Sequence, residues 1–289
     1  MQDFEYAIEV NNLTKKYDGF TLDNVSFKVP KGSIMGFIGQ NGAGKSTTIN
    51  AILNIVKKDE GEIKIFGLDN LNNETEVKEN LAAVFDELPF NEDLNAKILS
   101  KVMSDIYKNW DEKVFFNYLD IFSLPSKKAF KKFSKGMKMK LQLAVALSHH
   151  AKLLIMDEAT TGLDPVVRNE ILDIFMEYLQ DENNTIFMST HITSDLEKIA
   201  DMVTFIDKGK IILSGYKDEI LDNYGIIKCG KAEFESVDSA DYINARHTDY
   251  GVEMLVADRR KAAEKYTDMV VDKTTLDEIM VFLVYREMV

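Results

Sequence analysis

Short apolar runs separated by polar turns occupy the first part of the chain and predict β-strands. Residues Ile34–Ile38 form one such run and predict a buried strand. The run over residues 6–10 and the alternating apolar residues over 25–29 predict two more, so we expect residues 1–38 to be rich in β-structure. Leu81–Phe85 predicts a further short strand.

Strands and helices alternate over the middle of the chain. Runs that predict strands lie at residues 153–156, 185–189, 202–206 and 210–213. Residues from about 90 to 150, and residues 166–179, instead carry apolar side chains at helical spacing. This alternation predicts an α/β fold with a mixed sheet, a β-rich N-terminal part and an inserted helical subdomain at about 87–150.

The pattern weakens from about residue 222 onward. Short strands are predicted at Gly225–Cys229, 232–237 and Val252–Val256. A last helix is predicted to start at Thr275, because Glu278 follows three residues later and completes a capping box. We therefore expect residues 1–221 to form the main domain and residues 222–289 to form a small α+β domain.

The strongest chemical signal lies directly after the strand Ile34–Ile38. Residues 39–46 read GQNGAGKS and match the phosphate-binding loop G-x-x-x-x-G-K-[ST], called Walker A. Apolar residues follow at helical spacing, at Ile49, Ile52, Leu53 and Val56. Strand, glycine loop and helix together aim backbone N–H groups at an anion. The residues expected to bind nucleotide here are Gly39, Asn41, Gly42, Ala43, Gly44, Lys45, Ser46 and Thr47.

The motif also assigns individual roles and a class of fold. Lys45 is expected to reach the β- and γ-phosphates of ATP, and Ser46 to offer its hydroxyl to Mg²⁺. A phosphate loop in this position predicts a P-loop NTPase.

A pair of carboxylates forms the second signal. Asp157 and Glu158 end the apolar run at 153–156, and open α/β sheets place ligand sites at the carboxyl ends of their strands. Downstream of a phosphate loop this is a Walker B pattern. Asp157 is expected to hold the Mg²⁺ shell, and Glu158 to orient or deprotonate the attacking water.

Two further residues fit a nucleotide site by position. Tyr17 lies upstream of the phosphate loop and is either a packing residue or a platform on which adenine stacks. His191 follows the predicted strand at 185–189, and we favour a role in the site over a structural one, because the residue again lies at the end of a core strand.

Together these segments resemble the ATP-binding cassette (ABC) ATPase family over roughly residues 5–215. The segments that carry the resemblance are GQNGAGKS (39–46), FSKGMKMKL (133–141), LLIMDEATTGLD (153–164) and STH (189–191). The second is similar to the family's signature, usually written LSGGQ. Ser134 would cap the helix that follows, whose amino end can bind a phosphate.

The resemblance implies a head-to-tail dimer that sandwiches two ATP molecules. It implies that Ser134 and Gly136 meet ATP held by the other protomer, and that Asp164 belongs to the loop between protomers. It also assigns Tyr17 to adenine stacking and His191 to the γ-phosphate.

The sequence departs from the family pattern at the signature and at one loop. Phe133, Lys135 and Met137 stand where Leu, Gly and Gln are usual, and Lys135 either adds a charge near the partner's phosphate or faces solvent. Asp86 stands where the family has a Gln and is a further candidate Mg²⁺ ligand. Walker A, Walker B and His191 are unchanged, so we predict active ATP hydrolysis.

Composition and charge disfavour or exclude several classes of function and structure. The formal net charge of −13 disfavours nucleic-acid binding, and a single cysteine excludes an internal disulfide. No apolar run approaches the length of a membrane span, and the N-terminus lacks a signal-peptide core. The resemblance implies a cytoplasmic ATPase subunit, peripheral on the inner face of the membrane, which powers export through a separate permease. The Asp86 loop, the segment FSKGMKMKL and the small C-terminal part look like those of exporters of the bacitracin- or multidrug-resistance type.

The resemblance implies that a helix of the permease docks in a groove between the Asp86 loop and the helical subdomain. Candidate contacts there are Leu88, Pro89, Phe90 and Leu94, which could equally pack the loop locally. Two alternatives remain: a soluble ABC ATPase that acts on ribosomes or DNA, and a regulatory module that holds ATP without hydrolysing it.

Overall fold

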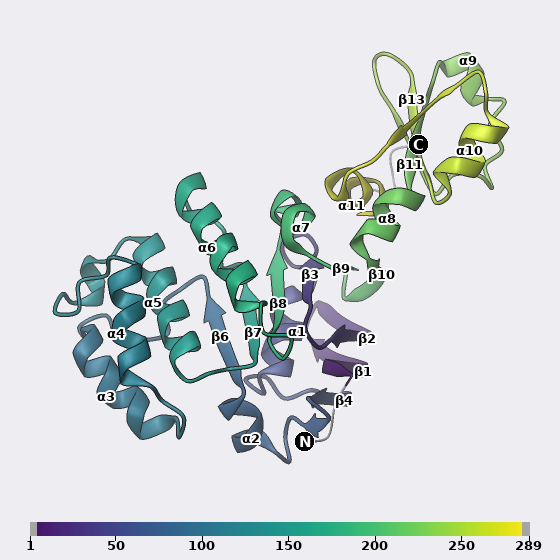
Figure 1. The fold of residues 1–289 in the computed structure, drawn as a ribbon. Helices are drawn as coiled ribbons and strands as arrows, with labels where there is room; N and C mark the ends of the chain where they lie inside the picture. The colour runs from purple at the N-terminus through teal and green to yellow at the C-terminus, as the bar shows by residue number, and fades with distance from the viewer. Residues whose placement is uncertain (1–4, 285–289) are drawn as a thin grey trace.

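The computed structural model describes residues 5–284 of the 289-residue chain, and a mixed six-stranded sheet lies at its centre (Figure 1). Its strands are β3 (Ile34–Ile38), β6 (Leu81–Phe85), β7 (Leu153–Asp157), β8 (Thr185–Thr190), β9 (Met202–Asp207) and β10 (Lys210–Tyr216). The order is β10-β9-β3-β8-β7-β6, parallel except for β10. The carboxyl ends of β3, β7 and β8 therefore meet at one edge of the sheet, where ligand sites form.

A second, antiparallel sheet covers the first near the N-terminus. Its strands are β2 (Phe20–Pro30), β1 (Tyr6–Tyr17), β4 (Glu60–Ile65) and β5 (Leu68–Asp69), in that order. Buried aromatic rings fill the space between the sheets. The ring centroid of Phe27 lies 5.3 Å from that of Phe37 and 5.4 Å from that of Phe187. The β-rich N-terminal part predicted from the sequence is thus one wall of a shared core.

The first strand is longer than the predicted run over residues 6–10. It continues to Tyr17, which pairs with Phe20 across the turn at Asp18 and Gly19. Register shifts interrupt the β1–β2 pairing after Val10 and again after Leu13. Such irregularities break the period-two alternation of side chains, so the pattern alone did not reveal the second half of the strand.

The helix after the phosphate loop is shorter than its apolar pattern suggested. It is α1 (Lys45–Ile52), so Val56 lies outside it. Asn54 adopts a left-handed backbone conformation with φ of 57°, which ends the helix.

The remaining helices of this part include the predicted helical subdomain. They are α2 (Glu74–Glu79), α3 (Ala96–Ile106), α4 (Glu112–Ile121), the 3₁₀ helix η1 (Phe130–Lys132), α5 (Lys135–Ser148), α6 (Pro165–Tyr178), α7 (Thr193–Ile199) and α8 (Lys217–Asn223). Helices α3, α4 and α5 stand beside β6, the edge strand of the six-stranded sheet (Figure 1).

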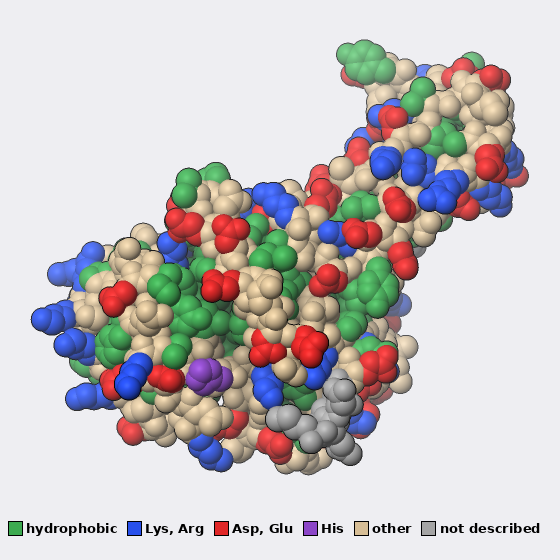
Figure 2. All heavy atoms as spheres, viewed as in Figure 1, with side chains coloured by type: hydrophobic (Ala, Val, Ile, Leu, Met, Phe, Trp, Pro, Cys, Tyr) green, Lys and Arg blue, Asp and Glu red, His purple; other side chains and the backbone are tan. Residues whose placement is uncertain are grey.

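Lysine and arginine side chains gather along the outer rim of these helices, although the chain as a whole is acidic (Figure 2). Across residues 5–284, no helix combines the length and the apolar character needed to cross a bilayer.

The C-terminal part forms a separate antiparallel sheet that projects from the main body (Figure 1). Its order is β12-β13-β11-β14, formed by β12 (Asn244–His247), β13 (Val252–Val256), β11 (Gly225–Cys229) and β14 (Val270–Lys273). Helices α9 (Lys231–Phe234) and α10 (Arg259–Lys265) connect the strands, which gives a β-α-β-β-α-β unit.

The prediction of a strand at residues 232–237 is wrong, because that segment begins within helix α9. The Glu233 carboxylate accepts a hydrogen bond of 2.6 Å from the Gly230 N–H, which favours the helical turn. The predicted capping box is confirmed at α11 (Leu276–Val284). The Thr275 N–H donates to Glu278 Oε2 at 3.0 Å, and the Glu278 N–H donates to Thr275 Oγ1 at 3.2 Å.

Helix α11 ties the C-terminal unit to the main body. It packs against α7, and the Leu276 N–H donates to Glu197 Oε1 of α7 at 2.8 Å. Leu276, Ile279 and Phe282 belong to the same buried apolar cluster as Leu196 of α7. The two parts of the chain therefore share a continuous core at this junction.

Candidate functional site

The phosphate loop lies between β3 and α1 and lines a cleft of 360 Å³. Gly44 has φ of 116°, a backbone conformation that a residue with a Cβ adopts only under strain. A Cβ at Gly39 would lie 2.5 Å from the carbonyl oxygen of Ile206 on β9. These glycines keep the loop tight against the sheet. Within it, Lys45 Nζ donates to Gly39 O at 2.7 Å and lies buried.

The cleft is lined by both predicted and unpredicted residues. Its lining is Phe20, Gln40, Asn41, Gly42, Gly44, Lys45, Ser46, Thr47 and Glu158. Phe20 was not predicted. It pairs with Tyr17 at the β1–β2 turn, where Tyr17 is 45% exposed. Phe20 lines the cleft, whereas Tyr17, its partner in the hairpin, does not belong to the lining, and its role in adenine stacking stays a prediction.

Strands β7 and β8 bring Asp157 beside a serine. The two strands are parallel neighbours, and Asp157 pairs in register with Ser189. Ser189 Oγ donates to Asp157 Oδ1 at 2.5 Å, and the Glu158 N–H donates to the same hydroxyl at 3.1 Å. Ser189 therefore contacts the Asp157 carboxylate and the backbone of Glu158, a role that was not assigned from the sequence.

Glu158 is the point at which the separate motifs meet. Its Oε1 lies 3.0 Å from Lys45 Nζ, and its Oε2 lies 2.7 Å from His191 Nδ1. The Thr161 hydroxyl donates to Oε2 at 2.8 Å. Glu158 itself has φ of 52°, an uncommon backbone conformation that is typical of functional sites. The structure thus joins Walker A, Walker B and His191 through one carboxylate.

The surroundings of Glu158 keep it ionised. Burial by itself raises the pKa of the carboxyl, but the hydrogen bond from Thr161, the ammonium of Lys45 and the hydrogen bond with His191 outweigh it. The net effect is a pKa below the ordinary glutamate value. A carboxylate that stays charged can accept a proton from water, which is what a general base requires.

The donor set near the cleft suits Mg²⁺. Ser46 supplies a hydroxyl and Asp157 a carboxylate, which are hard oxygen ligands that leave room for water and phosphate oxygens. Across residues 5–284, no group of three or more His, Cys, Asp or Glu side chains is arranged to hold a metal ion by itself.

Asp86, the third predicted metal ligand, has a different partner. Its carboxylate forms an ion pair with Lys135 at the start of α5. Two of the four residues that depart from the family pattern therefore pair with each other, and a metal-binding role for Asp86 stays a prediction.

The signature segment begins helix α5. Ser134 is its N-cap, and the side chain accepts a hydrogen bond of 3.3 Å from the Met137 N–H. A Cβ at Gly136 would lie 3.1 Å from Val167 of α6, so a glycine allows the two helices to approach closely.

Asp164 caps the neighbouring helix α6. Its carboxylate accepts hydrogen bonds of 3.1 Å from the N–H groups of Val166 and Val167, and Pro165 occupies the first helical position. This capping role is structural, and the role between protomers stays a prediction.

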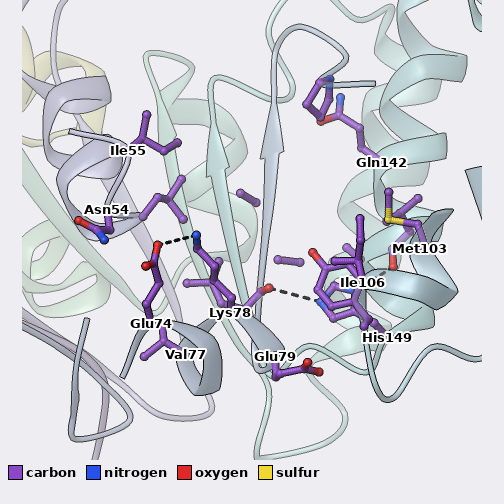
Figure 3. A pocket seen from close by; sticks show the side chains of 18 of the residues that line it. Asn54, Ile55, Glu74, Val77, Lys78, Glu79, Met103, Ile106, Gln142 and His149 are labelled. Carbon is purple, nitrogen blue, oxygen red and sulfur yellow. Dashed lines mark hydrogen bonds and ion pairs between the residues drawn. The ribbon is translucent and has the colours of Figure 1, made fainter. Parts of the chain in front are cut away.

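A second, apolar cavity of 470 Å³ lies between α1, α2, β6, α3 and α5 (Figure 3). Pro89 and Phe90, two of the four predicted permease contacts, line it, whereas Leu88 and Leu94 pack against the core. Glu74 and Lys78 form an ion pair of 2.6 Å at its rim. We call this cavity the α2–α3 groove.

Helix α3 extends the apolar surface beyond the α2–α3 groove. Ile98, Val102 and Ile106 are 46%, 39% and 56% exposed. Their spacing of four residues places them on one face of the helix. An exposed apolar stripe next to an apolar groove is typical of a protein interaction surface.

The chain is similar in sequence to several known proteins. A model of the family described as ABC transporter matches residues 22–161. The chain is 37% identical over 212 residues to the bacitracin transport ATP-binding protein BcrA of Bacillus licheniformis, covering 71% of this chain and 68% of that protein. It is 36% identical over 209 residues to the lantibiotic transport ATP-binding protein SrtF of Streptococcus pyogenes, covering 71% and 89%.

Solved structures show the same fold. A structure described as the ATP binding subunit of an ABC transporter matches with a TM-score of 0.68 at 28% identity, covering 74% of this chain and 91% of that one. A dimeric ATP-binding cassette bound to ADP and Pi matches with a TM-score of 0.65 at 18% identity, covering 72% and 98%.

Proposed function

The chain belongs to the family of ATP-binding ATPase subunits of ABC transporters, and from this premise we propose that it powers export through a separate membrane permease. The observation that carries the proposal is the position of Glu158, which contacts Lys45 and His191 and follows Asp157 directly. These are the groups that ATP hydrolysis requires, gathered at one end of the sheet.

The residues have distinct roles in this proposal. The loop Gly39–Thr47 binds the phosphates through its N–H groups, and the γ-phosphate takes the place of the Glu158 carboxylate beside Lys45. Glu158 then accepts a proton from the attacking water, while His191 binds the γ-phosphate. Mg²⁺, which neutralises charge on the phosphates, would be held by Ser46 and Asp157.

We propose that two cassettes close head to tail around two ATP molecules. Ser134 and Gly136 lie at the amino end of α5, whose partial positive charge suits the γ-phosphate bound to the other protomer. Asp164 lies at the amino end of α6, and Tyr17 contacts adenine. Whether the partner is a second copy or a related chain, the interface has the same chemistry.

The α2–α3 groove is the proposed docking site of the permease. It is apolar, it opens beside the exposed stripe of α3, and it is formed in part by the loop that follows Asp86. A helix of the permease with one apolar face would cover both surfaces. The chain would then act at the inner face of the membrane. Two of its relatives are named as bacitracin and lantibiotic transport proteins, which supports an antibiotic as the transported substrate.

The decisive experiment compares the wild-type chain with Glu158→Gln in the presence of Mg·ATP. We expect the wild type to release phosphate, and the variant to bind ATP but hydrolyse it about 10² to 10⁴ times more slowly, because the general base is lost. Size-exclusion chromatography should show an ATP-dependent dimer of the variant. Hydrolysis at the wild-type rate by Glu158→Gln would contradict the assignment. Purification with a polytopic membrane protein tests the transport role.

A further inference from the structure

Three polar side chains on one face of α5 bind the edge strand of the central sheet. Lys135, Gln142 and His149 are seven residues apart, and two turns of an α-helix return a side chain to nearly the same face. Lys135 pairs with Asp86, Gln142 binds the backbone of Phe85, and His149 Nε2 lies 3.3 Å from Leu81 O. Polar contacts therefore join α5 and its C-cap His149 to β6 and the residue after it, near both ends and in the middle of the helix.

Gln142 makes the most specific of these contacts. Its Oε1 accepts a hydrogen bond of 2.9 Å from the Phe85 N–H, and its Nε2 donates to Phe85 O at 3.0 Å. The side chain is only 3% exposed. Because β6 is the edge of its sheet, the outer N–H and C=O of Phe85 have no neighbouring strand, and the amide supplies both partners. Without it, two partly buried backbone groups would lose these hydrogen bonds.

The ion pair between Lys135 and Asp86 continues this connection to the first turn of the helix. A lysine at the amino end of a helix is unfavourable because of the helix dipole, and the Asp86 carboxylate offsets that charge. Asp86 directly follows Phe85, so the end of β6 and the signature end of α5 are held together by adjacent residues of one chain segment.

The same segment forms a wall of the α2–α3 groove. Four residues after Phe85, the loop reaches Pro89 and Phe90, which line the groove, and the Gln142 side chain lies at the groove as well (Figure 3). A partner helix in the groove and a nucleotide at the amino end of α5 would therefore both contact the same unit, which consists of α5, the end of β6 and the loop after it.

We propose that Gln142 is a positioning residue that couples the amino end of α5 to the α2–α3 groove, by holding the end of β6 and its loop to the helix. This rests on the proposed function, in which ATP meets the amino end of α5 in the closed dimer. When α5 moves toward the partner's ATP, the loop moves with it and the groove changes shape.

The test places a reporter in the groove. The single native cysteine is removed by Cys229→Ser, and Ile106→Cys, which replaces a residue 56% exposed in the groove lining, carries an environment-sensitive fluorophore. Glu158→Gln is included so that ATP is held rather than hydrolysed. We expect ATP to shift the fluorescence of this parent protein.

The variant Gln142→Met keeps the length of the side chain but removes both hydrogen bonds. We expect the ATP-dependent fluorescence shift to fall by about fivefold while binding of a fluorescent ATP analogue is retained, because coupling and not the nucleotide site is changed. Met103→Leu, an apolar exchange in the same groove, is the matched control and should keep the full shift.

A second variant covers the case in which Gln142→Met folds poorly. In Gln142→Glu a protonated carboxyl can both donate to Phe85 O and accept from the Phe85 N–H, whereas the carboxylate can only accept. The shift should therefore be present in mildly acidic buffer and lost in alkaline buffer, and the parent should show no such reversal.

Two results overturn the proposal. One is a full ATP-dependent shift in folded Gln142→Met, and the other is a pH-independent shift in Gln142→Glu. Failure of the parent protein to bind ATP at all would instead count against the proposed function, so the two ideas are tested separately.

Discussion

Glu158 shows how one side chain can connect motifs that are far apart in the sequence. Lys45 comes from the phosphate loop, Thr161 from the turn after β7 and His191 from the end of β8, and each contacts the same carboxylate. These contacts keep the pKa of the carboxyl below its ordinary value although the side chain is partly buried. In the proposed mechanism, hydrolysis would therefore depend on the electrostatic surroundings of this one carboxylate.

The pH dependence of hydrolysis follows from the lowered pKa of Glu158. The base is active only when unprotonated, so the acidic decline of kcat/KM should lie below the ordinary glutamate value of about 4.3. The stability of the fold should depend on pH with the same sign. Because the pKa of Glu158 is lower in the folded than in the unfolded chain, ionised Glu158 stabilises the fold above the unfolded pKa. This stabilisation is lost as the pH falls through the folded pKa. A kcat/KM profile in mildly acidic buffer that declines well above that value would contradict the assignment.

Replacing Thr161 tests the cause of that shift. Thr161→Val removes the hydroxyl that donates to Glu158 Oε2, so the pKa of Glu158 should rise and the acidic decline of kcat/KM should move to higher pH. Thr161→Ser keeps the hydroxyl and is the control. Identical pH profiles for the valine and serine variants would show that this hydrogen bond does not tune the base.

At the scale of elements, helix α5 combines a structural cap with a proposed ligand contact. Ser134 satisfies the Met137 N–H at the amino end, where the proposed closed dimer would place the partner's γ-phosphate. Two substitutions can separate these roles, because one removes the cap and the other keeps it while adding negative charge.

Ser134→Ala should lower the stability of the chain by about 1 kcal/mol, since the N-cap hydrogen bond is lost. Ser134→Asp keeps an acceptor and should remain close to wild-type stability, but its charge would repel the γ-phosphate and abolish the ATP-dependent dimer. Thermal unfolding and size-exclusion chromatography in the Glu158→Gln background measure the two effects. Full dimerisation of Ser134→Asp would exclude α5 from the nucleotide interface.

The exposed stripe of α3 leads to a prediction about docking. Ile106→Asp places a charge beside the α2–α3 groove and should abolish purification with the permease without changing thermal stability, because Ile106 is exposed. Ile121→Asp is the matched control, since Ile121 is 62% exposed on α4 but does not line the groove. Loss of the permease in both variants would point to a surface other than the groove.

For the whole molecule, α7 joins the catalytic region to the C-terminal unit. It follows His191 in the chain, its Leu196 lies in the shared core, and its Glu197 binds the first N–H of α11. The C-terminal unit is therefore fixed to the helix that follows His191, the residue proposed to bind the γ-phosphate. The unit projects away from the helical subdomain (Figure 1).

Removing the Glu197 carboxylate should loosen this junction. Glu197→Ala leaves the partly buried Leu276 N–H without an acceptor, at a cost of about 1–3 kcal/mol, whereas Glu197→Gln keeps a side-chain oxygen in place. Thermal unfolding should show a lower or split transition for the alanine variant alone. Equal transitions in both variants would mean that the apolar contacts of α11 suffice to hold the unit.

Much of the chemistry was predictable from the sequence because it lies in continuous segments. The phosphate loop, its strand and its helix are neighbours in the chain, and glycines at required positions identify them without knowledge of the fold. The strands β3 and β6 and the capping box at Thr275 were predictable for the same reason, since each depends on residues a few positions apart.

Only the tertiary structure decided which distant groups meet. Parallel pairing of β7 with β8 places Ser189 against Asp157, and packing of α5 along β6 pairs Asp86 with Lys135 and Gln142 with Phe85. The segment at 232–237 has a strand-like composition but begins with a helix, because strand formation requires a partner that local sequence does not specify. Local propensity determines short elements, whereas the contacts that shape this site depend on long-range packing.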